Sequence, residues 1–464
     1  MLHPDRLFPA DPATRRVARQ LFAAVGDLPI TSPHGHTDPR WWGENPAFAN
    51  PAELLVIPDH YVVRMLISQG VPFEALGIGE GAETDPRAIW RCFAAHYHLF
   101  QGTPSRLWLD HALSHVFGLD TRLAPDNADA AYDRIADCLA RPEFRPRALY
   151  DRFGIETIAT TDSALDDLRW HRMVRDSDWT GQVLPTYRPD GVVAPETPGF
   201  AAALERMGEL TGCDTATWQG YLPAHRQRRA FFRDMGATAT DHGHPTPRTA
   251  DLPPSEAGAL FDRIRTGRAG PEDAELFRAQ MLTEMARMSV DDGLVMQLHP
   301  GSFRNHSAAV LSRYGRDRGF DIPQPVSFTA ALKPLLDAVG MDARLRLILF
   351  TLDETTYSRE LAPLAGAWPS LRLGPPWWFH DSVEGIRRFR QQATETAGFF
   401  NTVGFNDDTR ALCSIPARHD LSRRADCAFL AELVVTHRLD ETEAHTLARL
   451  LARDLAREGY RLDG

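Results

Sequence analysis

Two histidines separated by one glycine, His34-Gly35-His36, are the residues of this sequence best suited to holding a metal ion. Alternate residues of a strand point to the same side, so both imidazoles can bind one cation while the glycine leaves space between them. Neutral imidazole is a good ligand for zinc and similar divalent metals. The motif alone is a weak signal, because such short spacings also arise by chance.

An acidic pair near the C-terminus could complete such a site. Asp407 and Asp408 end an apolar run and precede Thr409 and Arg410. An aspartate at this position can act as a further metal ligand or as a base. The alternative is structural, since Asp and Thr also favour the N-cap of a following helix. One aspartate could cap the helix while the other faces the site.

Two other polar clusters follow apolar runs in the middle of the chain. His299, in QLHPGS, could face the same site as His34 or could be a hydrogen-bonded turn residue. Asp241, in TDHGH, could be a functional carboxylate supported by His242 and His244, or these histidines could form a second metal pair. No lysine lies in this cluster, which disfavours a two-metal centre bridged by a modified lysine.

The single lysine of the chain limits the chemistry further. Lys333 is the only lysine among the 51 lysine and arginine residues. Schiff-base catalysis or a carbamylated-lysine bridge would have to use it. It lies in FTAALKPLLDAV, whose spacing of apolar residues predicts an amphipathic helix away from the polar clusters. We therefore expect one metal ion rather than two.

Arginines and tryptophans near the same clusters suggest a pocket for an anion. Arg188 and Arg410 each follow an apolar run, in a chain whose formal net charge is -11. Guanidinium groups pair with carboxylates in a bidentate fork, so these arginines predict an anionic substrate. Ion pairs with nearby aspartates are the structural alternative. Trp377 or Trp378 could form one wall of the pocket, although such aromatic runs are usually core.

The elements that must position these residues form a repeating pattern. Eight short β-rich runs end in polar residues, and segments of helical periodicity separate most of them. The runs are 28–36, 155–162, 183–190, 237–244, 293–302, 345–353, 371–381 and 400–410. Strand–helix alternation repeated eight times predicts an α/β fold, a (β/α)8 TIM barrel. Active sites of such barrels lie where the C-terminal ends of the strands meet.

The spacing of the runs also predicts the domain organisation. Residues 37–154 are too many for one crossover helix, and they include amphipathic stretches at 85–100 and 126–140. We expect a helical insertion after the first strand, able to cover the mouth of the barrel. The whole chain, 1–464, is then a single barrel domain that contains this insertion.

Composition excludes several classes of protein. The negative charge disfavours a nucleic-acid partner, and no run approaches the about 18 apolar residues of a membrane span. The N-terminus lacks the apolar core of a signal peptide, and the five cysteines include no CxxC pair. We expect a cytoplasmic enzyme with no membrane partner. The sequence leaves the oligomeric state open, including a homo-oligomer.

Over nearly its whole length, the chain resembles the uronate (glucuronate) isomerase family, a branch of the amidohydrolase superfamily. The motifs that carry the resemblance are SPHGHTDP, PDHYVVRMLISQGV, FGIETIATTD, YRPD, TDHGH, LHPGSFRN, LGPPWWFHD and GFNDDTR. The resemblance implies a barrel of the metal-dependent hydrolase type. It also implies one divalent metal ion, with zinc as the first candidate. His34 and His36 would be ligands, and Asp408 a further ligand or the proton carrier.

The same resemblance implies further pocket residues. They are Asp408, His299, Asp241 and Tyr61 as catalytic groups, and His60, Arg188, Arg410, Trp377 and Trp378 as substrate-binding groups. Asp408 is the first candidate for proton transfer, with Tyr61 or a metal-bound hydroxide as rivals. Arg188 or Arg410, together with His60, would hold a carboxylate.

The implied reaction is an aldose–ketose isomerisation in hexuronate catabolism. Members of the family convert D-glucuronate to D-fructuronate and D-galacturonate to D-tagaturonate. A base must move the C2 proton to C1 through an enediol, and an electrophile must stabilise the developing oxyanion. A metal-dependent hydrolase of the amidohydrolase superfamily is the alternative, because the same residues could activate water. A non-catalytic sugar-acid binding protein is disfavoured, because it leaves the polar strand ends without a role.

Overall fold

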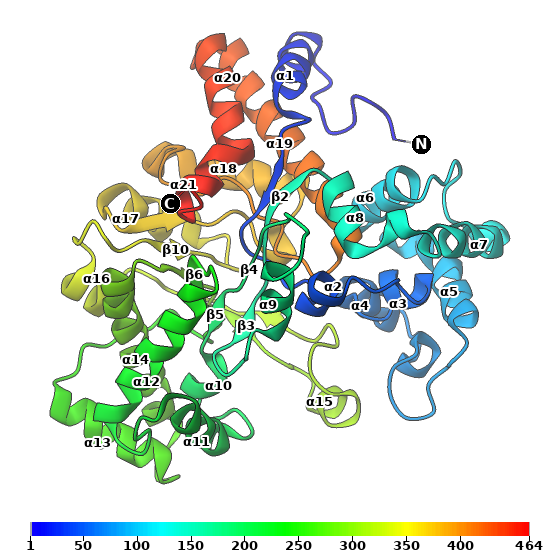
Figure 1. The fold of residues 1–464 in the computed structure, drawn as a ribbon. Coiled ribbons are helices and arrows are strands. Elements are labelled where there is room, and N and C mark those ends of the chain that lie inside the picture. The colour runs from blue at the N-terminus through cyan, green and yellow to red at the C-terminus, as the bar shows by residue number, and fades with distance from the viewer. Residues whose placement is uncertain (1, 464) are drawn as a thin grey trace.

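The computed structural model describes residues 2–463 and contains short parallel strands at its centre with helices around them (Figure 1). The order of the strands across each parallel sheet follows their order in the sequence. Two of the predicted runs each correspond to two short strands separated by a short interruption, β2 with β3 and β4 with β5, whose bounds follow. The strands are β1 (Ile30–Ser32), β2 (Ile155–Ala159), β3 (Asp162–Ser163), β4 (Val183–Leu184), β5 (Tyr187–Arg188), β6 (Ala239–His242), β7 (Val295–Leu298), β10 (Leu347–Leu349) and β11 (Leu371–Leu373). Seven of the eight predicted runs thus contain parallel strand.

The eighth run, 400–410, takes its place between β11 and β1 without forming a regular strand. Thr402 forms a parallel bridge with Leu373 of β11. At the other end, the His36 amide donates to the Thr409 carbonyl over 3.0 Å. Gly404 (φ 68°) and Asp408 (φ 38°) leave the extended region of backbone space, which explains why pairing is interrupted. The predicted (β/α)8 class is correct, but its last strand is irregular.

The segment between β1 and β2 is helical, as predicted. Residues 37–154, all of which the structure describes, contain no strand. Their α-helices are α2 (Pro39–Glu44), α3 (Pro51–Leu55), α4 (His60–Ser68), α5 (Pro86–Ala95), α6 (Pro104–His111), α7 (Ala128–Leu139) and α8 (Pro146–Arg152). Their apolar residues share one buried cluster with Ile30, Ile155 and Val183 of the barrel strands. The insertion therefore packs directly against the barrel strands. The description of residues 1–464 as one barrel domain with an insertion at 37–154 stays a prediction.

Helices cover the rest of the barrel. They are α1 (Pro12–Val25), α9 (Arg169–Arg175), α10 (Asp190–Val193), α11 (Phe200–Thr211), α12 (Trp218–Asp234), α13 (Pro254–Arg265), α14 (Pro271–Asp292), α15 (Ala308–Tyr314), α16 (Lys333–Val339), α17 (Ala362–Ala367), α18 (Val383–Ala397), α19 (Ile415–Val435), α20 (Glu441–Arg449) and α21 (Leu455–Gly459). A small antiparallel pair, β8 (Ser302–Phe303) with β9 (Ile322–Pro323), flanks α15. No helix within residues 2–463 combines the length and apolarity that crossing a bilayer requires.

Helix α14 shows how the sequence sets these elements. Pro271 opens the helix, where its missing N–H costs nothing, and Glu272 and Asp273 complement the positive end of the helix dipole. Gly293 (φ 81°) ends the helix in the left-handed conformation that glycine adopts readily. Helix α16 carries Lys333, which is exposed and pairs with Asp337 at 2.6 Å. The only lysine therefore lies on a helix, as predicted, and its side chain is exposed.

A tyrosine near the C-terminus, Tyr460, connects two segments of the barrel. Tyr460, which is fully buried, donates its hydroxyl hydrogen to Gln297 Oε1 over 2.8 Å and accepts from Asn406 Nδ2 over 2.9 Å. Gln297 belongs to β7 and Asn406 to the irregular eighth segment. One hydroxyl thus connects the two segments that lead to His299 and Asp408.

Replacement of Tyr460 by Phe tests this connection. The variant leaves two buried amide groups without their partner, so we expect the free energy of unfolding to fall by about 1–3 kcal/mol. A lower midpoint of thermal unfolding, measured by calorimetry, would show the loss. Tyr314→Phe is the control, because its hydroxyl binds Glu74 on the outside of the molecule. Equal midpoints for both variants would contradict a special role of the buried hydroxyl.

Candidate metal centre and active site

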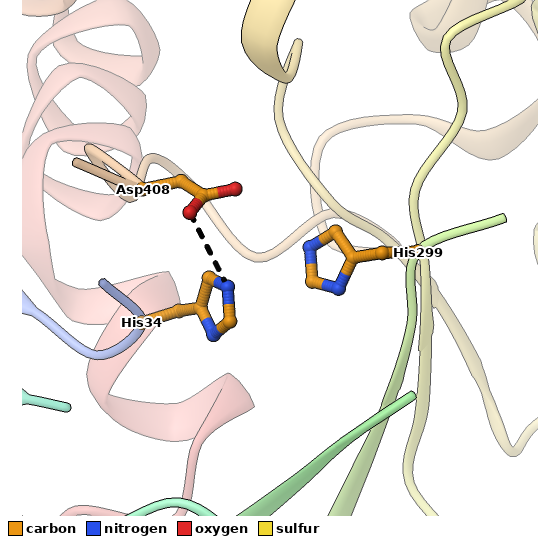
Figure 2. Close-up of side chains that lie close together, drawn as sticks. All are labelled: His34, His299 and Asp408. Atoms are coloured by element: carbon orange, nitrogen blue, oxygen red, sulfur yellow. Dashed lines mark ion pairs between the residues drawn. The ribbon is translucent and has the colours of Figure 1, made fainter. Parts of the chain in front are cut away.

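Three side chains from distant parts of the sequence meet above the strands. His34 follows β1, His299 follows β7 and Asp408 lies in the eighth segment (Figure 2). One nitrogen or oxygen of each lies within 4.8 Å of the others. The imidazoles of His34 and His299 stack with their centroids 4.7 Å apart. The barrel therefore brings together two imidazoles and one carboxylate, all suited to a divalent metal.

The Asp408 carboxylate uses one oxygen to contact both histidines of the HGH motif. Its Oδ1 lies 3.4 Å from His34 Nε2 and 3.1 Å from His36 Nε2. The other carboxylate oxygen points away from His34 (Figure 2) and has no ion pair within residues 2–463. The left-handed backbone of Asp408 is uncommon outside glycine and is typical of functional sites.

The ionisable groups of this cluster change one another's pKa values. Burial disfavours the ionised carboxylate, yet His34 and His36 lower the pKa of Asp408 well below its usual value. Burial also disfavours a charged His34, yet Asp408 and Asp241 raise its pKa. In the same way, Arg188 and His299 outweigh burial and lower the pKa of Asp241 well below the usual range. Asp408 and Asp241 are thus buried carboxylates that stay ionised because positively charged groups lie beside them. A bound divalent cation would stabilise the same negative charges.

Asp241 orients His299. The Nδ1 atom of His299 lies 2.6 Å from Asp241 Oδ1, while Asp241 Oδ2 lies 3.1 Å from Arg188 Nη1. We infer that Nδ1 carries the proton and donates it to this carboxylate. The buried Nε2 atom of His299 then has a free lone pair, and it has no hydrogen-bond partner in the described chain. This is the arrangement of a metal-binding histidine with a supporting carboxylate.

The donor set fits a zinc-type ion, and it differs in two respects from the sequence-based proposal. The ligand atoms that lie within 4.8 Å of one another belong to His34, His299 and Asp408, so His36 lies outside this group, although its Nε2 is 3.1 Å from Asp408 Oδ1. That proposal contained His34, His36 and Asp408 as ligands and treated His299 as a catalytic group. The geometry adds His299 as a candidate ligand, because its ring faces His34 across the barrel. Spacing along the chain could not reveal this, since β1 and β7 are not neighbours in the sheet.

A cavity of about 950 Å³ opens above the cluster. The predicted site residues in its wall are His36, His60, Tyr61, Arg188, Trp377, Trp378, Asp408 and Arg410. The other three, His34, Asp241 and His299, are buried beneath it. All the predicted site residues therefore lie in one region of the structure. Eight of them line the cavity, and the other three are buried next to it.

The insertion contributes His60 and Tyr61 from the first turn of α4. Asp59 caps this helix and accepts from the Tyr61 amide over 2.8 Å, which fixes the start of the helix at the cavity. The His60 ring stacks on Tyr61 at 4.5 Å and meets the edge of Trp378 at 5.5 Å. Both ring nitrogens of His60 are buried without a partner in residues 2–463. They are thus polar atoms without a protein partner in a residue that lines the cavity.

The two predicted arginines differ in their availability. Arg188 already pairs with Asp190 at 2.7 Å and with Asp241 at 3.1 Å. Arg410 makes no ion pair or side-chain hydrogen bond within the described residues, although it lines the cavity. The guanidinium group of Arg410 is therefore the one without a protein partner among the described residues. Arg188 forms the ion pairs with nearby aspartates that the sequence analysis gave as the alternative to substrate binding.

Sequence reasoning missed two charged residues of this region. Asp381 and Arg418 form a buried ion pair, and Arg418 also lines the cavity. Asp381 is visible in the sequence as the last residue of WWFHD, but its partner lies in a long helix. Helical periodicity gives no sign that this arginine reaches the site.

Comparison with known proteins decides the family. The glucuronate isomerase family profile matches residues 12–457. A protein named uronate isomerase from Rhizobium meliloti (strain 1021) is 62% identical over 466 residues, covering 100% of this chain and 99% of that protein. The crystal structure of glucuronate isomerase from Caulobacter crescentus has a TM-score of 0.99 and 57% identity, covering 100% of this chain and 98% of that one. The chain belongs to the glucuronate isomerase family.

A more distant solved structure shares the fold of this chain. A protein of Lactobacillus casei ATCC 334, described as a metal-dependent hydrolase, has a TM-score of 0.53 at 13% identity and covers 96% of this chain and 98% of that one. At this identity the likeness concerns the fold alone. It agrees with the predicted barrel type.

Replacement of Asp241 by Asn tests the support of His299. Loss of the carboxylate charge should weaken zinc binding by about tenfold or more, as is typical when a carboxylate behind a ligating histidine is removed. Competition with a chromophoric chelator measures this affinity. Asp190→Asn is the matched control, because Asp190 pairs with the same arginine without contacting His299. Unchanged zinc affinity in Asp241→Asn would exclude His299 as a supported ligand.

Proposed function

We propose that the chain catalyses the isomerisation of D-glucuronate to D-fructuronate and of D-galacturonate to D-tagaturonate at the floor of this cavity. Membership of the glucuronate isomerase family supports the reaction. The observation that carries the assignment to this site is the Asp408 carboxylate, which contacts two imidazoles with one oxygen and leaves the other free. A free carboxylate oxygen in a ligand cluster can accept and return a carbon-bound proton.

The residues around Asp408 suit one divalent metal ion, with zinc as the first candidate. His34, Asp408 and His299, through its free Nε2, would hold it. His36, whose Nε2 lies 3.1 Å from Asp408 Oδ1, is a further candidate ligand. When bound, the ion supplies Lewis acidity that polarises the carbonyl and hydroxyl oxygens of the sugar acid. Asp241 has no proton-transfer role in this proposal, because it is buried beneath the cavity and holds both His299 and Arg188.

Asp408 carries the proton between C2 and C1 of the open-chain substrate. The pKa of this carboxyl is well below its usual value, so the group starts as a carboxylate and can act as a base. Tyr61 has the complementary property. Burial raises the pKa of its phenol, which therefore keeps its proton and can donate a hydrogen bond to a substrate oxygen. Tyr61 thus supports the oxyanion, whereas Asp408 moves the carbon-bound proton.

Arg410 binds the substrate carboxylate at C6 in this proposal. Its guanidinium group is free of protein partners in the described chain and can form a bidentate pair with an anion. His60 lies in the same wall, and burial together with the Arg410 charge lowers its pKa well below the usual value. A neutral His60 can donate one hydrogen bond to the carboxylate or an adjacent hydroxyl. Arg188 has a secondary role, and Trp377 and Trp378 form part of the pocket wall, with Trp378 beside His60.

A metal-dependent hydrolase would use a similar donor set, and it remains the alternative chemistry for the cluster. The two reactions differ in what the cavity must supply, since isomerisation needs proton transfer within one molecule and no attacking water. The full-length similarity to uronate isomerases favours isomerisation.

Proton NMR in D₂O tests the proposed reaction directly. The purified protein, supplied with zinc, is incubated separately with D-glucuronate and D-galacturonate. We expect the ketose signals to appear for at least one of the two, with deuterium entering C1 to the extent that the Asp408 proton exchanges with solvent. Absence of turnover of both uronates would refute the proposed function.

Replacement of Arg410 by Gln tests carboxylate binding. Loss of a hydrogen-bonded charge pair should raise KM by about tenfold or more, corresponding to about 1.5–3 kcal/mol, with a smaller change in kcat. Steady-state kinetics with D-glucuronate provide the measurement. Arg316→Gln, at the exposed rim of the same cavity, is the control and should leave KM nearly unchanged. A normal KM in Arg410→Gln would assign the carboxylate to Arg188 instead.

A further inference from the structure

Arg418 connects three segments that build the active site. It is the fourth residue of α19 and is almost completely buried. Its guanidinium group forms an ion pair with Asp381, which follows the Trp377–Trp378 segment, and Nη1 lies 3.4 Å from the Asp407 carbonyl oxygen. That carbonyl belongs to the peptide joining Asp407 to Asp408. Arg418 therefore contacts the backbone immediately before the proposed proton carrier.

The same guanidinium group packs against the insertion. Its central carbon lies 3.6 Å from the centre of the Trp108 ring and 5.5 Å from the centre of the Tyr61 ring. These separations are typical of cation–π contacts, which become stronger away from water. Tyr61 itself meets Trp108 edge to face at 5.5 Å. Arg418 thus lies between Tyr61 and the peptide that precedes Asp408.

The position of Arg418 is unfavourable for a charged side chain in two ways. A positive charge near the N-terminal end of a helix is unfavourable, because the helix dipole is positive there. Burial of the charged Arg418 side chain also requires compensating contacts. The ion pair with Asp381 and the stacking on Trp108 are these contacts.

The next residue of α19 holds the same site from a second direction. His419 Nε2 lies 3.1 Å from the Asp407 side chain, while Arg418 contacts the Asp407 main chain. Asp408 has a left-handed backbone, which requires support from its surroundings. Two consecutive residues of one helix thus fix the residue before Asp408.

We propose that Arg418 is a positioning residue that sets the separation of Tyr61 and Asp408 for the isomerisation. The inference rests on the proposed function, since it assigns proton transfer to Asp408 and oxyanion support to Tyr61. Arg418 acts through these two residues and not through contact with the reacting carbons. Its loss should therefore lower kcat more than it raises KM.

Arg418→Lys is the variant that tests the proposal, with Arg390→Lys as its matched control. Arg390 forms an equally buried ion pair with Asp426, at 2.7 Å, but it does not line the cavity. Lysine keeps the charge and removes the planar fork and its stacking surface in both variants. We expect similar losses in thermal stability, but a fall in kcat of about tenfold or more only in Arg418→Lys.

Two additional measurements separate positioning from a structural effect. In a double-mutant cycle, Arg418→Lys should reduce kcat much less in a Tyr61→Phe background, because Phe lacks the hydroxyl that Arg418 is proposed to position. Titration of zinc into chelator-treated protein should show weaker binding in Arg418→Lys than in Arg390→Lys, since Asp408 is displaced. If Arg418→Lys fails to fold, Asp381→Asn removes the other half of the pair and is expected to show the same pattern.

Kinetics and zinc affinity of Arg418→Lys that match those of Arg390→Lys would overturn the proposal. Fully additive effects of Arg418→Lys and Tyr61→Phe would overturn the part that concerns Tyr61. If the unaltered protein does not isomerise uronates, the proposed function fails, and the zinc titration alone then decides whether Arg418 positions Asp408.

Discussion

The contact of one Asp408 oxygen with His34 and His36 is the interaction on which the rest of the site depends. A carboxylate at this depth is costly unless positive charge or a cation lies beside it. The contact also joins the first and last segments of the barrel, because the histidines follow β1 and Asp408 lies in the eighth segment. The site chemistry and the junction between the first and last segments of the barrel therefore lie at the same place, where the His36 amide also donates to the Thr409 carbonyl.

Much of the surrounding structure can be understood as support for this contact. Asp241 holds His299 against His34, and Arg188 compensates the Asp241 charge. Arg418 and His419 hold the residue before Asp408. Above the cluster, α4 places Tyr61 and His60 at the cavity. Buried, mutually supporting polar groups of this kind specify one arrangement because each unsatisfied member would be costly.

The sequence predicted the strand order and the residues at the strand ends because both depend on local signals. Apolar runs mark buried parallel strands, and the polar residues that follow them reach a common face. The irregular end of the barrel could not be predicted, since the left-handed backbone of Asp408 depends on contacts with distant residues. The role of His299 beside His34 and the burial of Arg418 likewise depend on pairings across the barrel. The free state of Arg410 also needed the structure, because the sequence showed nearby carboxylates without showing their partners.

The central claim is that a divalent metal ion bound by this cluster supports the isomerisation. Anomalous diffraction at the zinc absorption edge, from crystals prepared with zinc and D-glucuronate, tests it most directly. We expect one strong peak beside His34, His299 and Asp408, at the about 2.0–2.2 Å separations that zinc makes with nitrogen and oxygen ligands. A peak at another place, or a bound and converted sugar acid with no metal near Asp408, would contradict it.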